Sequence, residues 1–436
     1  MTVCTGSPDL FPACKSKKIT AAFDGGNVTS HGGMLLLRQA DRKLGLLKTV
    51  ATCFEDPRRK ASCEHSVESM LRQRVFALAA GEEDLNDHNE LRHDLMMQTA
   101  VERTSALASA PTLCRFENQA NREAGVGVHR VLVEQFIASQ KTAPKELVLD
   151  FDATDNPVHG LQEGRFFHGY YDRYCLLPLY VFCGDQILVA YLRPSNIDPA
   201  RHAWAVLKLL VKRLREEWPD VNIVFRADSG FCRWRMFRWM EKNQVEYVVG
   251  IGRNKVLERK AESWNEQAKA LHEDTGEKHQ VFGEFPYKAG TWDKERRVIL
   301  RAEHGDQGRN PRFVVTNREG EAEMIYRKEY CARGEMENRI KEQMQLFSDR
   351  SSAHRWWANQ HRLLLSALAY HLLERIRSLA LKGTRLAQAE CRTLRNKLLK
   401  IGGVITRNTR RIRIHLSSQC TAQDLYWRVA TTFAPG

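Results

Sequence analysis

The sequence predicts an α/β protein built around a mixed β-sheet with a β-rich insertion, preceded by a helical N-terminal domain and followed by a basic helical C-terminal region. Three observations indicate this class. Short apolar runs alternate with an amphipathic helix between residues 146 and 251, helical periodicity fills residues 31–140, and it returns after residue 326. We therefore divide the chain into five predicted segments, which are 1–140, 141–253, 254–321, 322–380 and 381–436.

The composition is that of a globular protein with more than one domain. A chain of 436 residues is too long for one compact core, and contents of 43% hydrophobic and 28% charged residues are ordinary. The longest near-apolar window, residues 363–373, is interrupted by His371, so we expect a core helix and no membrane span. No secretory signal is recognisable, and the eleven cysteines form no Cys-x-x-Cys pair. We expect a reduced cytoplasmic protein.

The net charge of +14 is concentrated at the C-terminal end. Residues 351–436 contain 15 Lys and Arg but only 3 Asp and Glu, which is +12 of the total. A basic end of this kind favours a polyanionic partner, most often nucleic acid. A charged surface that only improves solubility is the alternative.

The first 140 residues are predicted to be loop-like at first and then helical. Residues 1 to about 30 include Gly25-Gly26 and few periodic apolar side chains. Apolar residues then recur at helical spacing in residues 34–37, 44–50, 67–78, 91–97 and 128–137. The polar residues of this domain show no pattern that differs from a solvated surface.

The predicted strand at residues 146–154 ends in two carboxylates, Asp150 and Asp152. Because side chains alternate along a strand, both face the same side at its C-terminal end. Open α/β sheets keep their ligand crevices at such ends. A carboxylate that faces an interior is costly unless it is paired, hydrogen-bonded or bound to a metal. The alternative is that an aspartate here only forms a turn or cap.

The elements after this strand predict a particular sheet. Two strands joined by the Gly184-Asp185 turn come first, followed by a helix, a strand, a helix and a strand. Their predicted bounds are 176–183, 186–192, 202–218, 221–225, 234–241 and 247–251. This is the element order of an RNase H-like sheet, in which the first strand lies beside the fourth. Asp228, which follows the fourth strand, is therefore expected to lie beside Asp152.

The remaining residues predict an insertion and two long helices. Residues 254–316 are polar, with strand candidates at 280–282, 297–300 and 313–315, and we interpret them as an inserted β-rich subdomain. Helical periodicity resumes at 326–346 and again at 354–379. Basic helical and irregular segments follow to the end of the chain.

The helix predicted at residues 326–347 carries four polar side chains within roughly 80° of one another, at about 100° per residue. They are Tyr330, Arg333, Glu337 and Lys341. Taken alone, Arg333–Glu337 and Glu337–Lys341 are equally well explained as ordinary ion pairs on a solvated face. A functional interpretation depends on the occurrence of this helix together with Asp152 and Asp228. Their order along the chain is one in which a single fold could bring all three sites together.

These residues resemble the DDE transposases of bacterial insertion sequences. The resemblance rests on Asp-x-Thr at Asp152, the strand-end Asp228, and the Tyr330-x2-Arg333-x3-Glu337 motif after a β-rich insertion. The runs HGLQEGRFFHGYY at 159–171 and RPSNID at 193–198 are similar to one branch of that group. The motif usually has a lysine seven positions after its glutamate. Met344 occupies that position here, and Lys341 is the candidate to replace it.

The resemblance implies a metal-dependent enzyme that cuts DNA at inverted-repeat ends and joins a 3′-hydroxyl to target DNA. Asp152 would bridge two ions, while Asp228 and Glu337 would each complete one coordination shell. Three crowded carboxylates repel by roughly 4 kcal/mol per pair at ~4 Å and an effective dielectric of 20. All-oxygen ligation favours Mg²⁺, with Mn²⁺ as a substitute. Arg333 would contact a phosphate, and Tyr330 would lie near the cleaved strand. Asp150 is the alternative for the first carboxylate, although no threonine follows it in that pattern.

The resemblance also implies a homodimer on paired DNA ends, a DNA-binding or dimerisation role for the N-terminal helical domain, and a location at the bacterial nucleoid. Other candidates for DNA contact are Trp292, which would wedge against an unstacked base, and a phosphate-contacting strip of Arg407, Arg410, Arg411 and Arg413. Trp292 in a local core and the arginines in a solvated tail are the alternatives. His159 and His168 are expected to order their loop.

Two other functions remain open from the sequence. One is an RNase H-like nuclease that cuts DNA without joining it. The other is a non-catalytic DNA-binding or regulatory protein derived from a transposase.

Overall fold

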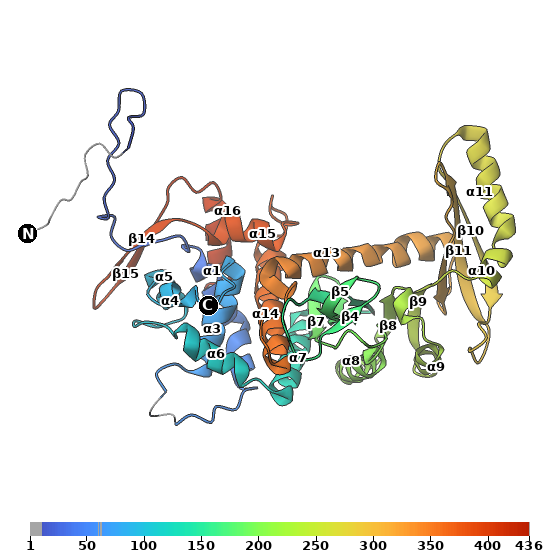
Figure 1. The fold of residues 1–436 in the computed structure, drawn as a ribbon, viewed down its shortest axis with the longest axis horizontal. Helices are drawn as coiled ribbons and strands as arrows, with labels where there is room; N and C mark the ends of the chain where they lie inside the picture. Colours follow the sequence, from blue (N-terminus) through green and yellow to red (C-terminus); the bar gives the residue numbers. More distant parts are fainter. Residues whose placement is uncertain (1–10, 60, 62, 436) are drawn as a thin grey trace, which may run out of the picture. The chain divides into compact units, whose positions relative to one another are not determined.

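The computed structural model describes residues 11–59, 61 and 63–435, which form two compact units (Figure 1). Unit 1 comprises residues 1–47, 57–116 and 375–436, and unit 2 comprises residues 48–56 and 117–374. The loop-like prediction for residues 1–10 falls outside the described residues. No helix in the described part of the chain is long and apolar enough to cross a membrane.

Unit 2 is built on one mixed sheet of nine strands, in the order β10-β11-β13-β9-β8-β2-β6-β7, with β12 paired to β11. The central strands β2 (Glu146–Ala153), β8 (Asn222–Ala227) and β9 (Val245–Ile251) are parallel. The hairpin of β6 (Leu179–Cys183) and β7 (Gln186–Tyr191) adds to β2 in the antiparallel sense. The prediction that the first strand lies beside the fourth is confirmed.

Helices cover one face of this sheet and bury its main core. They include α7 (Arg122–Ser139), α8 (Ala203–Glu217) and α9 (Trp234–Lys242), whose apolar residues meet Leu147, Leu149 and Phe151 of β2. Figure 1 shows α8 and α9 on the opposite side of the strands from α13. Because β2 alternates, its other residues face the second layer, where Val148 packs with Val224, Val248 and Ile325.

The second layer is a helical segment from residue 322 to residue 348, close to the predicted 326–347. It consists of α12 (Ala322–Met324), a π-helical stretch (Ile325–Tyr330), a short 3₁₀ turn (Cys331–Arg333), α13 (Gly334–Gln343) and a second π stretch (Met344–Ser348). The segment breaks at Phe347, whose φ is 68°. π-helical turns often occur at functional sites, because they change which side chains share a face.

The segment at 254–321 differs from the inserted subdomain that its polarity suggested. Its strands β10 (His279–Tyr287), β11 (Arg296–Gly305) and β13 (Arg312–Thr316) extend the main sheet through β13, which pairs with β9. It also contains two helices that periodicity did not reveal, α10 (Lys255–Lys260) and α11 (Glu262–Thr275). Their ends carry local signals: Asn254 caps α10, and Gly276 ends α11 in the left-handed region at φ 70°.

A small three-stranded sheet adjoins the end of β2. It has the order β3-β5-β4, formed by β3 (Asn156–Pro157), β4 (Phe166–His168) and β5 (Arg173–Leu176). The long helix α14 (Trp356–Ala380) corresponds to the core helix predicted at 354–379. Within unit 2 its Tyr370 ring meets the Phe182 ring of β6 at 5.8 Å between centroids.

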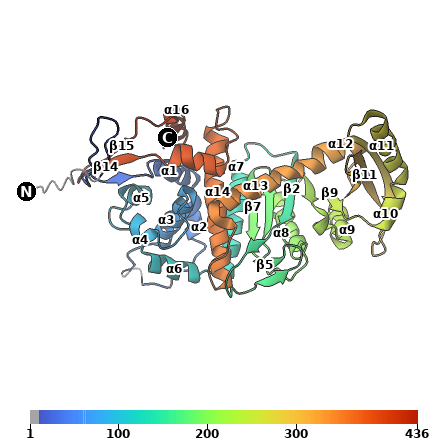
Figure 2. The ribbon, with the colours of Figure 1, turned by 45° about the horizontal axis from the view of Figure 1, so that its top comes forward.

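Unit 1 joins segments from both ends of the chain, which the sequence division had placed in separate domains. Its helices include α1 (Met34–Leu44), α3 (Val67–Ala80), α5 (Leu95–Ala100) and α16 (Gln423–Thr432). A sheet of three strands, β1 (Val28–Thr29), β14 (Gly403–Arg407) and β15 (Ile412–Leu416), connects residues near the N-terminus to the C-terminal region. Figure 2 shows β14 and β15 side by side near α1.

Shorter helices complete the two units. Unit 1 also contains α4 (His88–Leu91), α15 (Cys391–Leu394) and the π turn Arg395–Leu399. The helices α2 (Leu46–Ala51) and α6 (Ala110–Asn118) lie where the chain passes between the units. The strands β14 and β15 correct the expectation of a helical C-terminal region. The β-branched residues Val404, Ile405, Ile412 and Ile414 favour an extended backbone there.

Candidate active site

The two predicted aspartates lie at one end of the sheet. Asp152 is in β2, and Asp228 follows β8 directly; these parallel strands are paired with Phe151 opposite Ala227. The carboxyl ends of parallel strands share an edge, so residues far apart in the chain become neighbours. Asp228 also accepts a hydrogen bond from the Gly230 N–H at 2.9 Å, which fixes the turn after β8.

The helical segment of residues 322–348 brings the third carboxylate to this edge. Arg333 Nη1 donates to Asp152 Oδ2 at 3.4 Å, and Arg333 Nη2 donates to Glu337 Oε1 at 2.7 Å. The guanidinium therefore bridges the carboxylates of β2 and α13. The ion pair Arg333–Glu337 is the i,i+4 pair that the sequence also allowed, but its second contact, to Asp152, connects the helix to the sheet.

Tyr330 lies against the same edge because the facing strand has a glycine there. A Cβ atom on Gly250 of β9 would come within 2.6 Å of the Tyr330 hydroxyl and 2.9 Å of the Ser229 backbone nitrogen. Burial raises the pKa of Tyr330, and the nearby Asp228 charge also acts in that direction. The phenol is thus held beside Asp228, and only glycine at position 250 leaves the space for it.

Asp150 faces the same layer as Asp152 but is already fully paired. Arg226 of β8 donates to both of its carboxylate oxygens, at 2.5 and 2.7 Å, and the Asp150 side chain is buried. The third nitrogen of Arg226, Nη1, donates to the Glu329 carbonyl at 2.7 Å, one residue before Tyr330. Asp150 therefore holds the helical segment against the strand ends through Arg226.

The electrostatics of Asp152 differ from those of a well-compensated carboxylate. Burial raises its pKa to about 7, and the negative charges of Asp228 and Glu337 add to that effect, while Arg333 acts against it. Its other hydrogen bond comes from the Ala153 N–H at 2.8 Å. Two of the three carboxylates thus share the Arg333 guanidinium, and the site carries an excess of negative charge.

The donor set suits a hard divalent cation, although the residues are not arranged around one. Carboxylate oxygens are the ligands that Mg²⁺ and Mn²⁺ prefer. In the described part of the chain, no three His, Cys, Asp or Glu side chains are gathered closely enough to hold a metal ion. Arg333 contacts two of the three carboxylates and partly balances their charge. A cation would take over that balance.

We expect the stability of the metal-free protein to depend on Asp152 in a defined pH window. Because its pKa is raised to about 7 in the folded chain, the folded protein keeps a proton that the unfolded chain releases near pH 4. This contribution to the free energy of unfolding is complete below about pH 4 and is lost as pH rises through 7. At about 1.4 kcal/mol per pKa unit it amounts to at most about 4 kcal/mol.

The measurement is urea unfolding of unit 2 at pH 5 and pH 8 in EDTA, for wild type and Asp152→Asn. The wild type should lose more stability than the variant between these pH values, and Mg²⁺ at pH 8 should restore stability to the wild type alone. Asp220→Asn, which changes an exposed carboxylate in the turn before β8, is the control. An equal pH dependence in wild type and Asp152→Asn would contradict the assignment.

The remaining predicted residues lie apart from the carboxylates or are already used in packing. Lys341 is exposed on α13, one turn after Glu337, and Met344 begins the π stretch that follows. Trp292 is buried in the main core of unit 2, with its ring 5.9 Å from Phe237 and 5.5 Å from Tyr287 between centroids. Trp292 thus occupies a local core position, which is the alternative to contact with DNA.

The predicted phosphate-contacting strip forms the exposed end of the β14–β15 hairpin in unit 1. The side chains of Arg407, Arg410, Arg411 and Arg413 are all exposed there. Arg407 also donates to Gln98 Oε1 at 3.1 Å. The strip lies on a β-hairpin rather than on an irregular tail. In unit 2, His159 is exposed, and His168 is half-buried in β4, where its ring lies 4.9 Å from Tyr171.

Sequence reasoning missed three residues that shape the site. Arg226 was not recognised as the partner of Asp150, although its place in the strand before Asp228 gives it the same face. Gly250 was visible only as a glycine inside a strand, which signals a close approach by another group. Tyr171 ends the run at 159–171, and that run by itself assigns it no role. Its pKa is raised by burial and by the charges of Asp155 and Asp152, so it lies close to the carboxylates.

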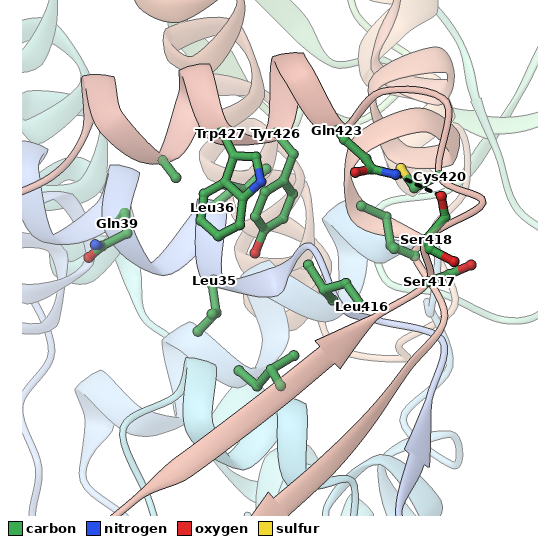
Figure 3. Close-up of a pocket in the computed structure, with 13 residues that line it drawn as sticks. Leu35, Leu36, Gln39, Leu416, Ser417, Ser418, Cys420, Gln423, Tyr426 and Trp427 are labelled. Atoms are coloured by element: carbon green, nitrogen blue, oxygen red, sulfur yellow. Dashed lines mark hydrogen bonds between the residues drawn. The ribbon is translucent and has the colours of Figure 1, made fainter.

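Unit 1 contains a cavity of about 510 Å³ between α1, β15 and α16 (Figure 3). Its lining is largely apolar and includes Leu36, Leu416, Tyr426 and Trp427, and Gln423 donates to the Ser418 carbonyl at 2.7 Å. None of the lining residues is charged. The cavity therefore offers no carboxylate ligand for a hard cation, and its titratable groups are the Cys420 thiol and the Tyr426 phenol.

The mixed sheet, with acidic side chains and a guanidinium at its edge, defines an α/β protein with an acidic candidate site. The chain belongs to the family described as transposase DDE domain, group 1, which matches residues 11–435. This confirms the predicted membership among DDE transposases. Among solved structures the chain is similar to a piggyBac transposase in a synaptic complex with hairpin DNA. That similarity has 10% identity and a TM-score of 0.42, over 84% of this chain and 78% of the other. The search of curated proteins found no match to this chain.

Proposed function

We propose that this protein is a metal-dependent transposase that cleaves DNA at inverted-repeat ends and joins the 3′-hydroxyl to target DNA. The observation that carries the proposal is the meeting of Asp152 and Asp228 at one strand edge, with Arg333 connecting Asp152 to Glu337. Family membership explains why these acids should act on DNA. The strand order β7-β6-β2-β8-β9 supports an RNase H-like core, and the Tyr330, Arg333 and Glu337 spacing supports an origin in a bacterial insertion sequence.

Asp152, Asp228 and Glu337 would hold two Mg²⁺ ions, or Mn²⁺ in their place. When bound, the ions supply Lewis-acid activation of a water or 3′-hydroxyl and stabilise the leaving oxygen. The chain provides the rest. The Asp152 carboxyl releases its proton on loading, Arg333 exchanges a carboxylate for a phosphate oxygen, and Tyr330 borders the position of the cleaved strand. Lys341 adds a positive charge one turn further along α13.

Contacts with duplex DNA away from the site are assigned to the basic hairpin of unit 1. Its four arginines are exposed on neighbouring strands and their connecting turn, where they suit a phosphate backbone. We also propose that two copies act together on paired ends, that the N-terminal helices contribute DNA binding or dimer contacts, and that the protein works at the bacterial nucleoid.

The test begins with the DNA that flanks the coding region, where short inverted repeats are expected. Oligonucleotides that carry these repeats, either intact or already cut at the 3′ end, are incubated with the protein, target plasmid and Mg²⁺. Joined product from the pre-cut ends supports a transposase. Cleavage of intact ends without joined product favours the nuclease, and specific binding with neither reaction favours a non-catalytic derivative.

A further inference from the structure

The hairpin of β4 and β5 exposes an unusual number of aromatic side chains. We call residues 166–174 the aromatic hairpin. The exposed fractions are 43% for Phe166, 54% for Phe167, 85% for Tyr170 and 49% for Tyr174. Large apolar rings gathered this closely on a surface mark a binding site more often than chance exposure.

The aromatic hairpin is anchored at the active-site end of the sheet. Its strand β5 pairs with β3, which begins four residues after Asp152. Asn156 of β3 donates to the Ser348 carbonyl at 2.8 Å, at the end of the helical segment that carries Glu337. On the other edge, the Ser195 hydroxyl donates to the Phe166 carbonyl at 2.9 Å. These bonds hold the aromatic hairpin in a fixed place next to the carboxylates.

The rings of the aromatic hairpin support one another through edge-to-face contacts. Phe167 and Tyr174 meet edge to face at 5.7 Å, and Tyr170 and Tyr171 do the same at 5.0 Å. The Arg165 guanidinium lies over the Tyr174 ring, 4.7 Å from its centroid. Rings that are already ordered lose little conformational freedom when a further aromatic group stacks on them.

We propose that the aromatic hairpin is a stacking platform for unpaired bases of the DNA end that is held in the active site. This inference rests on the proposed function and extends it. Where the DNA end is opened beside Asp152, its unpaired bases lose their stacking partners, and an aromatic surface can replace them. Aromatic side chains provide this for any base, because every base has a π-face.

The local charge argues for stacking rather than for phosphate contact. Within residues 166–174 the charge of Arg173 is balanced by Asp172, and just before them the charge of Arg165 is balanced by Glu163, so the aromatic hairpin adds no net positive charge for a phosphate. Binding through phosphates would be weakened strongly by salt, whereas binding through stacked bases would not. The contribution of the aromatic hairpin to DNA affinity should therefore be nearly independent of salt.

The test uses the full chain with Phe167 and Tyr170 both changed to Ala, in EDTA so that no cleavage occurs. Fluorescence anisotropy compares a duplex of about 20 base pairs with the same duplex carrying an unpaired tail of about five nucleotides. Wild type should bind the tailed DNA more tightly. The double variant should lose about 10- to 100-fold in affinity for the tail, at low and high salt alike, with unchanged affinity for the duplex.

Two controls separate stacking from other effects. Leu209→Ala removes an apolar side chain of α8 that is 69% exposed and should change nothing. Phe167→Trp with Tyr170→Trp should keep the preference for the tail. No loss in the alanine variant, equal loss on both probes, or dissociation of a dimer by light scattering would overturn the proposal. Asp152→Asn should still prefer the tailed DNA over the duplex. Because this preference is measured as binding, it can be present even if the protein does not catalyse the proposed reaction.

Discussion

Asp152→Asn should lower the rates of DNA cleavage and strand transfer by about a thousandfold or more, which corresponds to at least about 4 kcal/mol of transition-state stabilisation. The change keeps the shape of the side chain but removes the charge at the centre of the site. Because Asp152 lies beside Asp228 and shares Arg333 with Glu337, no other carboxylate can take its place. The measurement is a time course with pre-cut repeat ends in Mg²⁺.

The control for this prediction is the fold of the variant. Burial raises the pKa of the Asp152 carboxyl, so a neutral amide should be tolerated and the thermal unfolding of unit 2 should be unchanged or improved. A folded Asp152→Asn protein that still transfers strands at the wild-type rate would remove the carboxylates from the mechanism. The family assignment would stand, but the protein would need a different active site.

Asp150→Asn should affect stability, which Asp152→Asn leaves unchanged or improved. It should destabilise unit 2 by about 3–5 kcal/mol, because it leaves a buried guanidinium without its anionic partner. Arg226 contacts Asp150 through two nitrogens and Glu329 through the third. Loss of the carboxylate therefore also loosens the helical segment that presents Arg333 and Glu337. Urea unfolding at pH 7 measures the effect.

A double variant makes this second prediction specific. Changing Asp150 and Arg226 together to Leu removes both charges, and the free energy of unfolding should recover most of the loss, since a buried pair contributes little relative to apolar residues. If the double variant instead lost as much stability as the sum of the losses of the two single variants, the two side chains would not depend on each other. A stable Asp150→Asn protein without activity would instead return Asp150 to the list of direct catalytic candidates.

The sequence was sufficient to predict those elements whose structure is decided by a local pattern. The alternation of β2, the Gly184-Asp185 turn and the periodicity of α8 each depend on residues near one another in the chain, and the structure has these elements at the predicted places. Together they also gave the strand order, because few sheets accommodate that succession of elements. The neighbourhood of Asp152 and Asp228 follows from it.

The sequence was insufficient where two distant segments must meet. The division into domains separated the ends of the chain, whereas β1 pairs with β14 within unit 1. It also placed α7 in the N-terminal domain, whereas Phe136 and Ile137 pack in the main core of unit 2. Helical periodicity shows that a face is apolar but not which partner will cover it.

Residue types and their spacing were enough to identify the side chains that could form an acidic site: Asp152, Asp228 and Glu337, with Arg333 and Tyr330 on the same helical segment. The sequence favours Asp152 over Asp150 because a threonine follows it in the motif, and the structure adds that the two carboxylates, which share one face of one strand, have different partners across the fold. Asp150 meets Arg226, which donates to both of its carboxylate oxygens, whereas Asp152 lies near the negative charges of Asp228 and Glu337; burial raises the pKa of both carboxyls. Such differences come from long-range packing, since the energy of a buried charge depends on the groups that surround it.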